Sequence, residues 1–230
     1  QTERLAFAAS AKILASAYEK CGYVRSLRKG FPQASNTYFR SVSDGVEMAV
    51  TCADTTVRVV IPKKDADGQA VIEVKNEGSF TEYVQQVGEL AKLLPADTAI
   101  TIKAGQNMVE GQWENGNCST PIIPMMPTMS DDALPDLTPK EPKTFKIKAG
   151  ALFDAIGAAL WCVADDPIRP AFSYICIDPA GDDVIDVWAT DIHNLVRVTA
   201  SVSDVSSDQE RIMLHGSVAT ALFNILKKTT

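Results

Sequence analysis

Residues 188–195 read Trp-Ala-Thr-Asp-Ile-His-Asn-Leu, and this stretch decides how the rest of the chain is interpreted. Apolar and polar residues alternate over residues 184–190 and again over 194–200, which predicts two strands joined by a tight turn. A related pair, Ala53-Asp54, stands 137 residues earlier and also lies between two alternating segments, at 46–51 and 56–61. The chain is therefore expected to contain an internal repeat.

The elements on either side of these two segments follow the same order. The first half predicts helices at 10–22 and 81–94, the second capped by Ser79 or Thr81, and strands at 46–51, 56–61, 70–75, 98–103 and 107–113. The second half predicts helices at 150–163 and 217–228, and strands at 145–147, 171–177, 184–190, 194–200 and 211–215. Val24 then corresponds to Val163, and Lys92 to Lys227, at nearly the same offset.

A proline-rich connector separates the two halves. Residues 121–142 hold six of the twelve prolines, and proline removes a backbone donor and blocks regular pairing. We expect a first domain over residues 1–140, including this connector, and a second over 144–230. The second copy lacks counterparts of the final two strands of the first, so it is expected to be incomplete, and a third domain is expected to be absent.

Composition excludes several classes of protein. The net charge of −7 makes nucleic-acid binding an unlikely default, although residues 1–29 hold six bases and only two acids. Five cysteines without a Cys-x-x-Cys spacing argue against a disulfide framework or a zinc ribbon, and they favour a reduced, cytoplasmic protein. No apolar stretch reaches the length of a membrane span, so no membrane partner is expected.

The segment at 189–195 resembles the Ala-Thr-Asp-Gly-His-Arg-Leu signature of the bacterial DNA polymerase III beta subunit, the sliding clamp. Residues 166–175, 51–54, 93–95 and the connector are similar to other parts of that family, so the resemblance covers essentially the whole chain at low identity. Two positions depart from the signature, because Ile192 replaces the usual Gly and Asn194 the usual Arg. A β-branched residue at a glycine position restricts φ and fills space, so a narrower groove or altered specificity is expected.

The resemblance implies an α+β fold of tandem clamp domains, each with two helices packed on antiparallel sheets. It also implies a non-catalytic processivity factor without cofactors, in which two chains of three domains form a head-to-tail homodimeric ring around duplex DNA. The implied partners are the DNA polymerase III catalytic subunit, the clamp loader and other proteins that carry a clamp-binding motif.

The family's functional positions map onto two sets of residues. Bases that would face DNA phosphates without reading sequence are Lys12, Lys20, Arg25, Arg28, Lys29, Lys92, Lys227 and Lys228. Positions that would form the partner-peptide groove are Phe172, Thr190, Ile192, His193, Asn194 and Leu195. Each single lysine is also compatible with an ordinary solvated helix face, and the groove set with a plain packing motif at a turn.

An enzyme is the weaker interpretation. Asp191 and His193 resemble a metal-binding pair, but a hydrolytic metal site usually has three protein ligands and the only other histidine is His215. Neither a nucleophile elbow nor a glycine-rich phosphate loop occurs. We therefore expect no catalytic and no metal-ligating residues. The serious alternative is a duplicated α+β module that binds only proteins, which would lack the salt-dependent DNA contact of a clamp.

Overall fold

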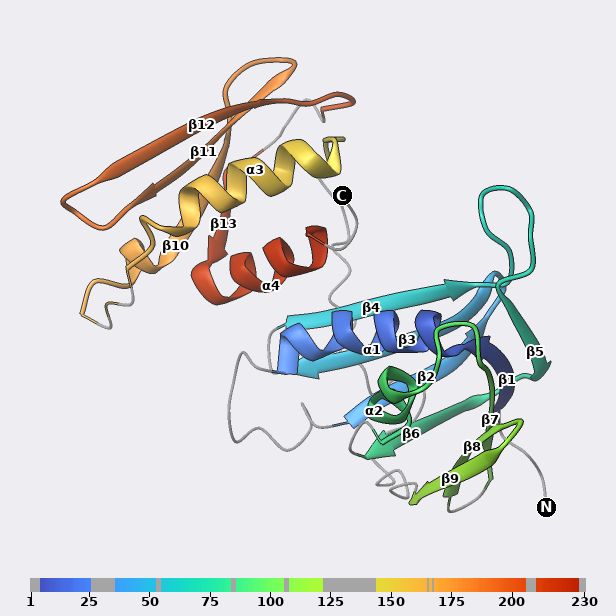
Figure 1. Cartoon of the computed structure of the whole chain (residues 1–230). Coiled ribbons are helices and arrows are strands. Elements are labelled where there is room, and N and C mark those ends of the chain that lie inside the picture. The colour runs from blue at the N-terminus through green and yellow to red at the C-terminus, as the bar shows by residue number, and fades with distance from the viewer. Residues whose placement is uncertain are drawn as a thin grey trace. The chain divides into compact units, whose positions relative to one another are not determined.

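The computed structural model describes residues 5–25, 36–52, 55–83, 86–105, 108–121, 144–164, 166, 168–205 and 210–227. The chain divides into two compact units, residues 1–137 and residues 138–230 (Figure 1). Among the described residues, no helix is both long enough and apolar enough to span a membrane.

The first unit places two helices against two antiparallel sheets. Its helices are α1 (Ala11–Arg25) and α2 (Gln86–Leu93). One sheet has the order β5-β1-β7-β8-β9 and the other the order β4-β3-β2-β6. The strands are β1 (Leu5–Ser10), β2 (Asn36–Val42), β3 (Gly45–Cys52), β4 (Thr55–Pro62), β5 (Ile72–Asn76), β6 (Ser79–Tyr83), β7 (Ala99–Ala104), β8 (Met108–Trp113) and β9 (Gly116–Pro121).

The second unit repeats part of this arrangement. Its elements are α3 (Ala149–Leu160), a 3-10 turn (Pro170–Ser173), β10 (Tyr174–Pro179), β11 (Val184–Thr190), β12 (Leu195–Ser201), β13 (Ile212–His215) and α4 (Gly216–Leu226). The order β12-β11-β10-β13 matches β4-β3-β2-β6 of the first unit strand for strand. The predicted α+β fold is therefore confirmed for the described residues, with two helices packed on two antiparallel sheets in the first unit and on one antiparallel sheet in the second.

In both units a glycine lets the two helices approach closely. In the first unit, a Cβ at Gly88 of α2 would lie 2.4 Å from the ring of Tyr18 on α1. In the second unit, a Cβ at Gly157 of α3 would lie 2.8 Å from the ring of Phe223 on α4, which itself stacks on Phe153 at 4.5 Å between centroids. An aromatic ring thus packs over glycine backbone in each helix pair.

The predicted helix over 81–94 is wrong over residues 81–83. Residues Ser79–Tyr83 form strand β6, which pairs antiparallel with β2, and the helix extends only over Gln86–Leu93. Phe80 stacks on Phe39 at 4.5 Å, and this cross-strand packing outweighs the local helical pattern. Neither Ser79 nor Thr81 caps the helix. Glu82 does so from the strand, because its side chain accepts the backbone N–H of Val87 at 3.2 Å.

Other predicted boundaries need smaller corrections. Residues 145–147 form no strand but one isolated bridge between Lys146 and Ser203. The strand predicted from residue 171 begins at Tyr174, because a 3-10 turn occupies residues 170–173. Strands β1, β2 and β9 were not anticipated. Asp54, the first-copy counterpart of Asp191, lies outside the described residues.

Candidate functional site

The turn between β11 and β12 lies in the segment of residues 188–195, Trp-Ala-Thr-Asp-Ile-His-Asn-Leu. Thr190 and Leu195 are the last cross-strand pair of the hairpin. The Thr190 hydroxyl donates to the Asn194 carbonyl at 2.7 Å and accepts the Ile192 N–H at 3.1 Å. A single threonine side chain therefore bonds to both limbs of the turn, which holds residues 191–194 in one conformation.

Asp191 holds the same turn from inside. Its Oδ1 accepts the N–H groups of His193 at 3.0 Å and Asn194 at 2.6 Å, while its Oδ2 accepts the Asn194 side-chain amide at 3.0 Å. The side-chain amide of Asn194 and then its backbone N–H lower the pKa of the Asp191 carboxyl. The carboxylate lone pairs are therefore directed into the turn. Among the described residues no group of three His, Cys, Asp or Glu side chains could hold a metal ion.

Ile192 adopts a backbone conformation that favours glycine. Its φ is 84°, in the left-handed region where a β-branched side chain is strained. The residue that departs from the resembled signature thus adopts a backbone conformation that glycine takes without strain. Its side chain is 46% exposed, so the extra volume lies at the surface of the turn.

Replacing Ile192 with glycine should therefore stabilise the chain by about 1 kcal/mol, because relief of the strain outweighs the greater backbone entropy of glycine in the unfolded state. Urea denaturation measures the change. His193→Gly is the matched control: His193 lies in the same turn but has a negative φ, so this substitution should destabilise the chain. Equal effects of the two substitutions would contradict the assignment of strain to Ile192.

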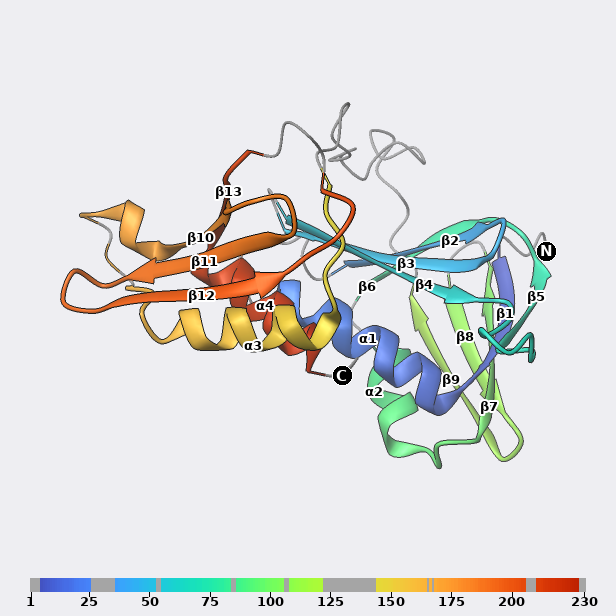
Figure 2. The same cartoon turned by 90° about the horizontal axis from the view of Figure 1, so that it is seen from above.

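The segment after α3 lies at the same end of the sheet as this turn (Figure 2). Burial raises the pKa of the Cys162 thiol, and the Asp191 carboxylate raises it further. The Ala164 N–H donates to the Phe172 carbonyl at 2.9 Å. The guanidinium of Arg169 lies 5.7 Å from the centre of the Phe172 ring. These contacts bring Phe172 to the end of the sheet where the turn lies.

Exposed apolar side chains gather at this end of the second unit. Leu195 is 66% exposed, Trp161 62% and Ile168 86%. The groove predicted from sequence includes Leu195 but neither Trp161 nor Ile168. Trp161 could have been noticed as an aromatic residue off the apolar stripe of its helix. Ile168 gives no comparable signal, because it lies in no helix or strand and so has no periodic pattern.

The predicted DNA-facing bases are only partly described. Lys12 and Lys20 lie on α1, exposed and half-buried respectively, and Lys92 is exposed on α2. Lys227 is the exposed C-cap of α4. Arg25 ends α1, but its side chain lies outside the described part, as do all of Arg28, Lys29 and Lys228.

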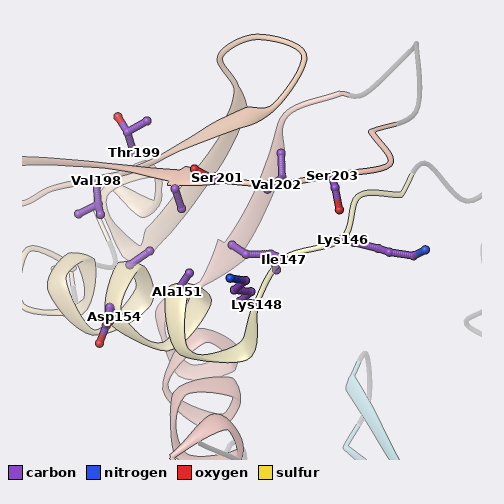
Figure 3. A pocket seen from close by; sticks show the side chains of 12 residues that line it. Lys146, Ile147, Lys148, Ala151, Asp154, Val198, Thr199, Ser201, Val202 and Ser203 are labelled. Atoms are coloured by element: carbon purple, nitrogen blue, oxygen red, sulfur yellow. The ribbon is translucent and has the colours of Figure 1, made fainter.

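A pocket of about 750 Å³ lies away from the predicted groove, between the start of α3 and strand β12 (Figure 3). Ile147, Ala151 and Val198 contribute apolar lining. Figure 3 shows Lys146 and Asp154 pointing away from each other, and Lys146 is paired with Asp204 at 2.6 Å. The charged groups therefore do not converge on a common point, and none of the predicted site residues lines this pocket.

No protein-family model matches the chain, and no curated protein matches it. Solved structures do match. The DNA polymerase sliding clamp from Bacillus subtilis has a TM-score of 0.80 at 19% identity, over 96% of this chain and 57% of that one. The DNA polymerase III beta chain from Streptococcus pneumoniae has a TM-score of 0.78 at 14% identity, over 96% and 56%. The DNA polymerase III beta subunit from Pseudomonas aeruginosa has a TM-score of 0.76 at 17% identity, over 97% and 57%.

The chain thus spans little more than half the length of the clamps that it matches. At such low identity the likeness establishes the fold and not the activity. The helix pairs, the repeated sheet order and these matches lead to one conclusion: the chain has the sliding-clamp fold of the bacterial DNA polymerase III beta subunit.

Proposed function

We propose that this chain is a processivity clamp, a non-catalytic protein that tethers a DNA polymerase to duplex DNA. The fold carries the proposal, because a sliding-clamp structure matches 96% of the chain with a TM-score of 0.80. The chain spans 57% of that clamp. The proposal that DNA is encircled by a homodimeric ring therefore refers to a clamp of the full length of the matched structure, of which this chain covers 57%.

The end of the second unit supports a role in binding partner peptides. Leu195 and Trp161 are exposed, so their apolar area is not buried in the core. The hydrogen bonds of Thr190 and Asp191 fix the turn that precedes Leu195. Exposed apolar side chains on a preformed turn suit the binding of a short peptide, because the protein loses little conformational entropy when the peptide binds. The proposed partners are the DNA polymerase III catalytic subunit, the clamp loader and other proteins with a clamp-binding motif.

Leu195→Ala should weaken binding of a clamp-motif peptide about tenfold, which corresponds to about 1.4 kcal/mol. The substitution removes apolar area that the peptide would cover, at a position that is 66% exposed and so adds little to stability. Isothermal titration calorimetry measures the affinity. Val60→Ala is the matched control, because Val60 is also an exposed apolar strand residue but lies on β4 of the first unit.

Equal affinities of the two variants would contradict the proposed site, and no binding by the wild-type chain would contradict peptide tethering altogether.

Fluorescence anisotropy with a labelled duplex at low salt tests whether the chain contacts DNA, the second part of the proposal. A clamp should show weak, sequence-independent and steeply salt-dependent contact. Peptide binding without any such contact would favour the alternative function, an interaction module that binds only proteins.

A further inference from the structure

The extended segment before α3, residues 144–148, is paired along one edge only. Lys146 forms both hydrogen bonds of an antiparallel bridge with Ser203, its N–H donating at 2.7 Å and its C=O accepting at 2.8 Å. Figure 3 shows the two residues on neighbouring segments. Backbone groups of successive extended residues point to opposite sides, so those of Phe145 and Ile147 point away from Ser203. Neither residue forms a backbone hydrogen bond with any other described residue.

The first unit shows the same position paired along both edges. Ala8 stands three residues before α1, as Lys146 stands three residues before α3. Strand β1, which contains Ala8, pairs with β5 on one side and with β7 on the other. Ser203 follows β12 as β5 follows β4, so its bridge to Lys146 corresponds to the pairing of β5 with β1. The open edge of residues 144–148 therefore corresponds to the edge that β7 covers in the first unit.

The first turn of α3 shows the same difference from the first unit. In α1, the N–H of Ala11 donates to the Thr98 carbonyl at 2.8 Å, and the next N–H donates to the Ala96 carbonyl at 3.0 Å. Both carbonyls lie in the segment that leads into β7. The corresponding N–H groups of α3, at Ala149 and Gly150, have no such acceptor among the described residues, and the N-cap side chain makes no capping bond. A strand on the path of β7 would supply the missing acceptors.

The apolar side chains beside the open edge are also incompletely covered. In the first unit Phe7 of β1 is buried, and so are Ile100 and Ile102 of β7, which pairs with β1. In the second unit Phe145 and Ile147 are only partly buried, although both pack against the core. A strand with apolar residues at alternate positions would cover them, as β7 covers β1.

Two lysines set the charge beside the open edge. Lys146 and Lys148 are two residues apart, so their side chains lie on the same face of the segment, and both are exposed. Lys146 pairs with Asp204 at 2.6 Å, a surface pair of the kind that contributes little free energy. Lys148 forms no ion pair with a described residue. Opposite charges at facing cross-strand positions attract, so a docked strand should carry acidic residues between its apolar ones.

We propose that the open edge of residues 144–148 binds an extended segment of another protein, in which apolar and acidic residues alternate, by antiparallel strand addition. The docked segment takes the place that β7 has in the first unit. Its backbone pairs with Phe145 and Ile147 and supplies affinity, while its acids face Lys146 and Lys148 and supply selectivity. This edge lies at the start of α3 and the turn at 190–195 beside the segment after α3, so the inference does not depend on the proposed clamp function.

A peptide built on β7 tests the proposal. Residues 96–104 of this chain, with Ala99→Glu and Thr101→Glu, present alternating glutamates and isoleucines in the register that β7 has against β1. Anisotropy of the labelled peptide, titrated with the whole chain, should show saturable binding. The affinity should be about tenfold higher than that of the same peptide with lysine at both substituted positions, because two attractive cross-strand pairs become repulsive.

Methyl groups on the peptide backbone provide the matched control. N-methylation of the two isoleucine amides removes the donors that face Phe145 and Ile147, so it should weaken binding about tenfold or more. N-methylation of the two glutamate amides blocks donors on the far edge of the docked strand, so the affinity should change less than about twofold. Equal affinities of the two methylated peptides would overturn strand addition, as would the absence of saturable binding by the unmethylated acidic peptide.

Hydrogen exchange and one charge reversal locate the site. Bound peptide should slow amide exchange at the four residues with open N–H groups, which are Phe145, Ile147, Ala149 and Gly150. Exchange at Lys146, whose N–H already bonds to Ser203, should change little. Lys148→Glu should weaken binding of the acidic peptide about fivefold, whereas Lys64→Glu, the same change in charge at an exposed position of the first unit, should not. Equal effects of the two reversals would overturn the inference.

The Leu195→Ala variant separates this inference from the proposed function. It should bind the acidic peptide as tightly as the wild-type chain does, because Leu195 follows the turn and lies away from the start of α3. Weaker binding by this variant would place the acidic peptide at the turn and overturn the inference. Failure of the clamp-motif peptide to bind would contradict only the proposed function.

Discussion

Gly88→Ala is expected to destabilise the first unit by about 2 kcal/mol or more. The new Cβ would lie 2.4 Å from Cγ of Tyr18 and 2.9 Å from its Cβ, distances at which one of the two helices must move. The ring cannot easily turn aside, because Tyr18 is buried and its hydroxyl donates to Glu82. Overpacking of this kind costs about 1–3 kcal/mol and occasionally more. This cost exceeds the roughly 1 kcal/mol by which alanine favours a helix over glycine.

Gly22→Ala is the matched control, because it makes the same change in α1. A Cβ at Gly22 would meet no atom within 4 Å. Only the gain in helix propensity remains there, so this variant should be more stable than wild type by about 0.5–1 kcal/mol. Urea denaturation of both variants measures the two changes. If both substitutions stabilise the chain, the close approach of α2 to Tyr18 is wrong.

Tyr18→Phe is expected to cost about 2–3 kcal/mol, although it removes a single oxygen atom. Glu82 is only 1% exposed, and its two carboxyl oxygens accept the Tyr18 hydroxyl and the Val87 N–H. Loss of a donor to a buried carboxyl group leaves much of its desolvation penalty uncompensated, and the cost is larger for a charged group. The contact joins three elements, because α1 supplies the tyrosine, β6 the acid and α2 the capped N–H group.

Tyr23→Phe makes the same change on the same helix, but the Tyr23 hydroxyl donates at 3.0 Å to Glu19, which is only half-buried. This variant should change the free energy of unfolding by less than about 0.5 kcal/mol. A double variant, Tyr18→Phe/Glu82→Leu, should recover part of the loss, because no carboxyl group then remains to be satisfied. If Tyr18→Phe and Tyr23→Phe have equal effects, the buried contact is not a determinant of stability.

The sequence pattern predicts an element correctly where the interactions that form it join residues close together in the chain. The strand predicted over 184–190 has those same bounds in the structure, and the turn at 191–194 follows it as expected. Alternating apolar residues and a Thr-Asp turn are local features, since their periodicity and hydrogen bonds involve residues close in sequence. The repeated element order also follows from pattern alone, and it is found in the matching sheets of the two units.

Local pattern failed where a distant contact outweighs it. Residues 81–83 are predicted to begin a helix, yet they continue strand β6, in which Phe80 stacks on Phe39. The role of Glu82 as a buried cap could not be predicted, because its partner Tyr18 is 64 residues away. Exposure of Ile168 could not be predicted either, because it depends on the path of a loop with no periodicity.

The amino-acid sequence was thus enough to identify the fold class, the internal repeat and the turn at 190–195, because hydrophobic periodicity and turn chemistry act over a few residues. Only the tertiary structure showed that Ile192 keeps a glycine-like backbone and that Trp161 lies exposed at the end of α3. These features depend on which surfaces are buried against each other, and burial is decided by contacts between segments far apart in the chain.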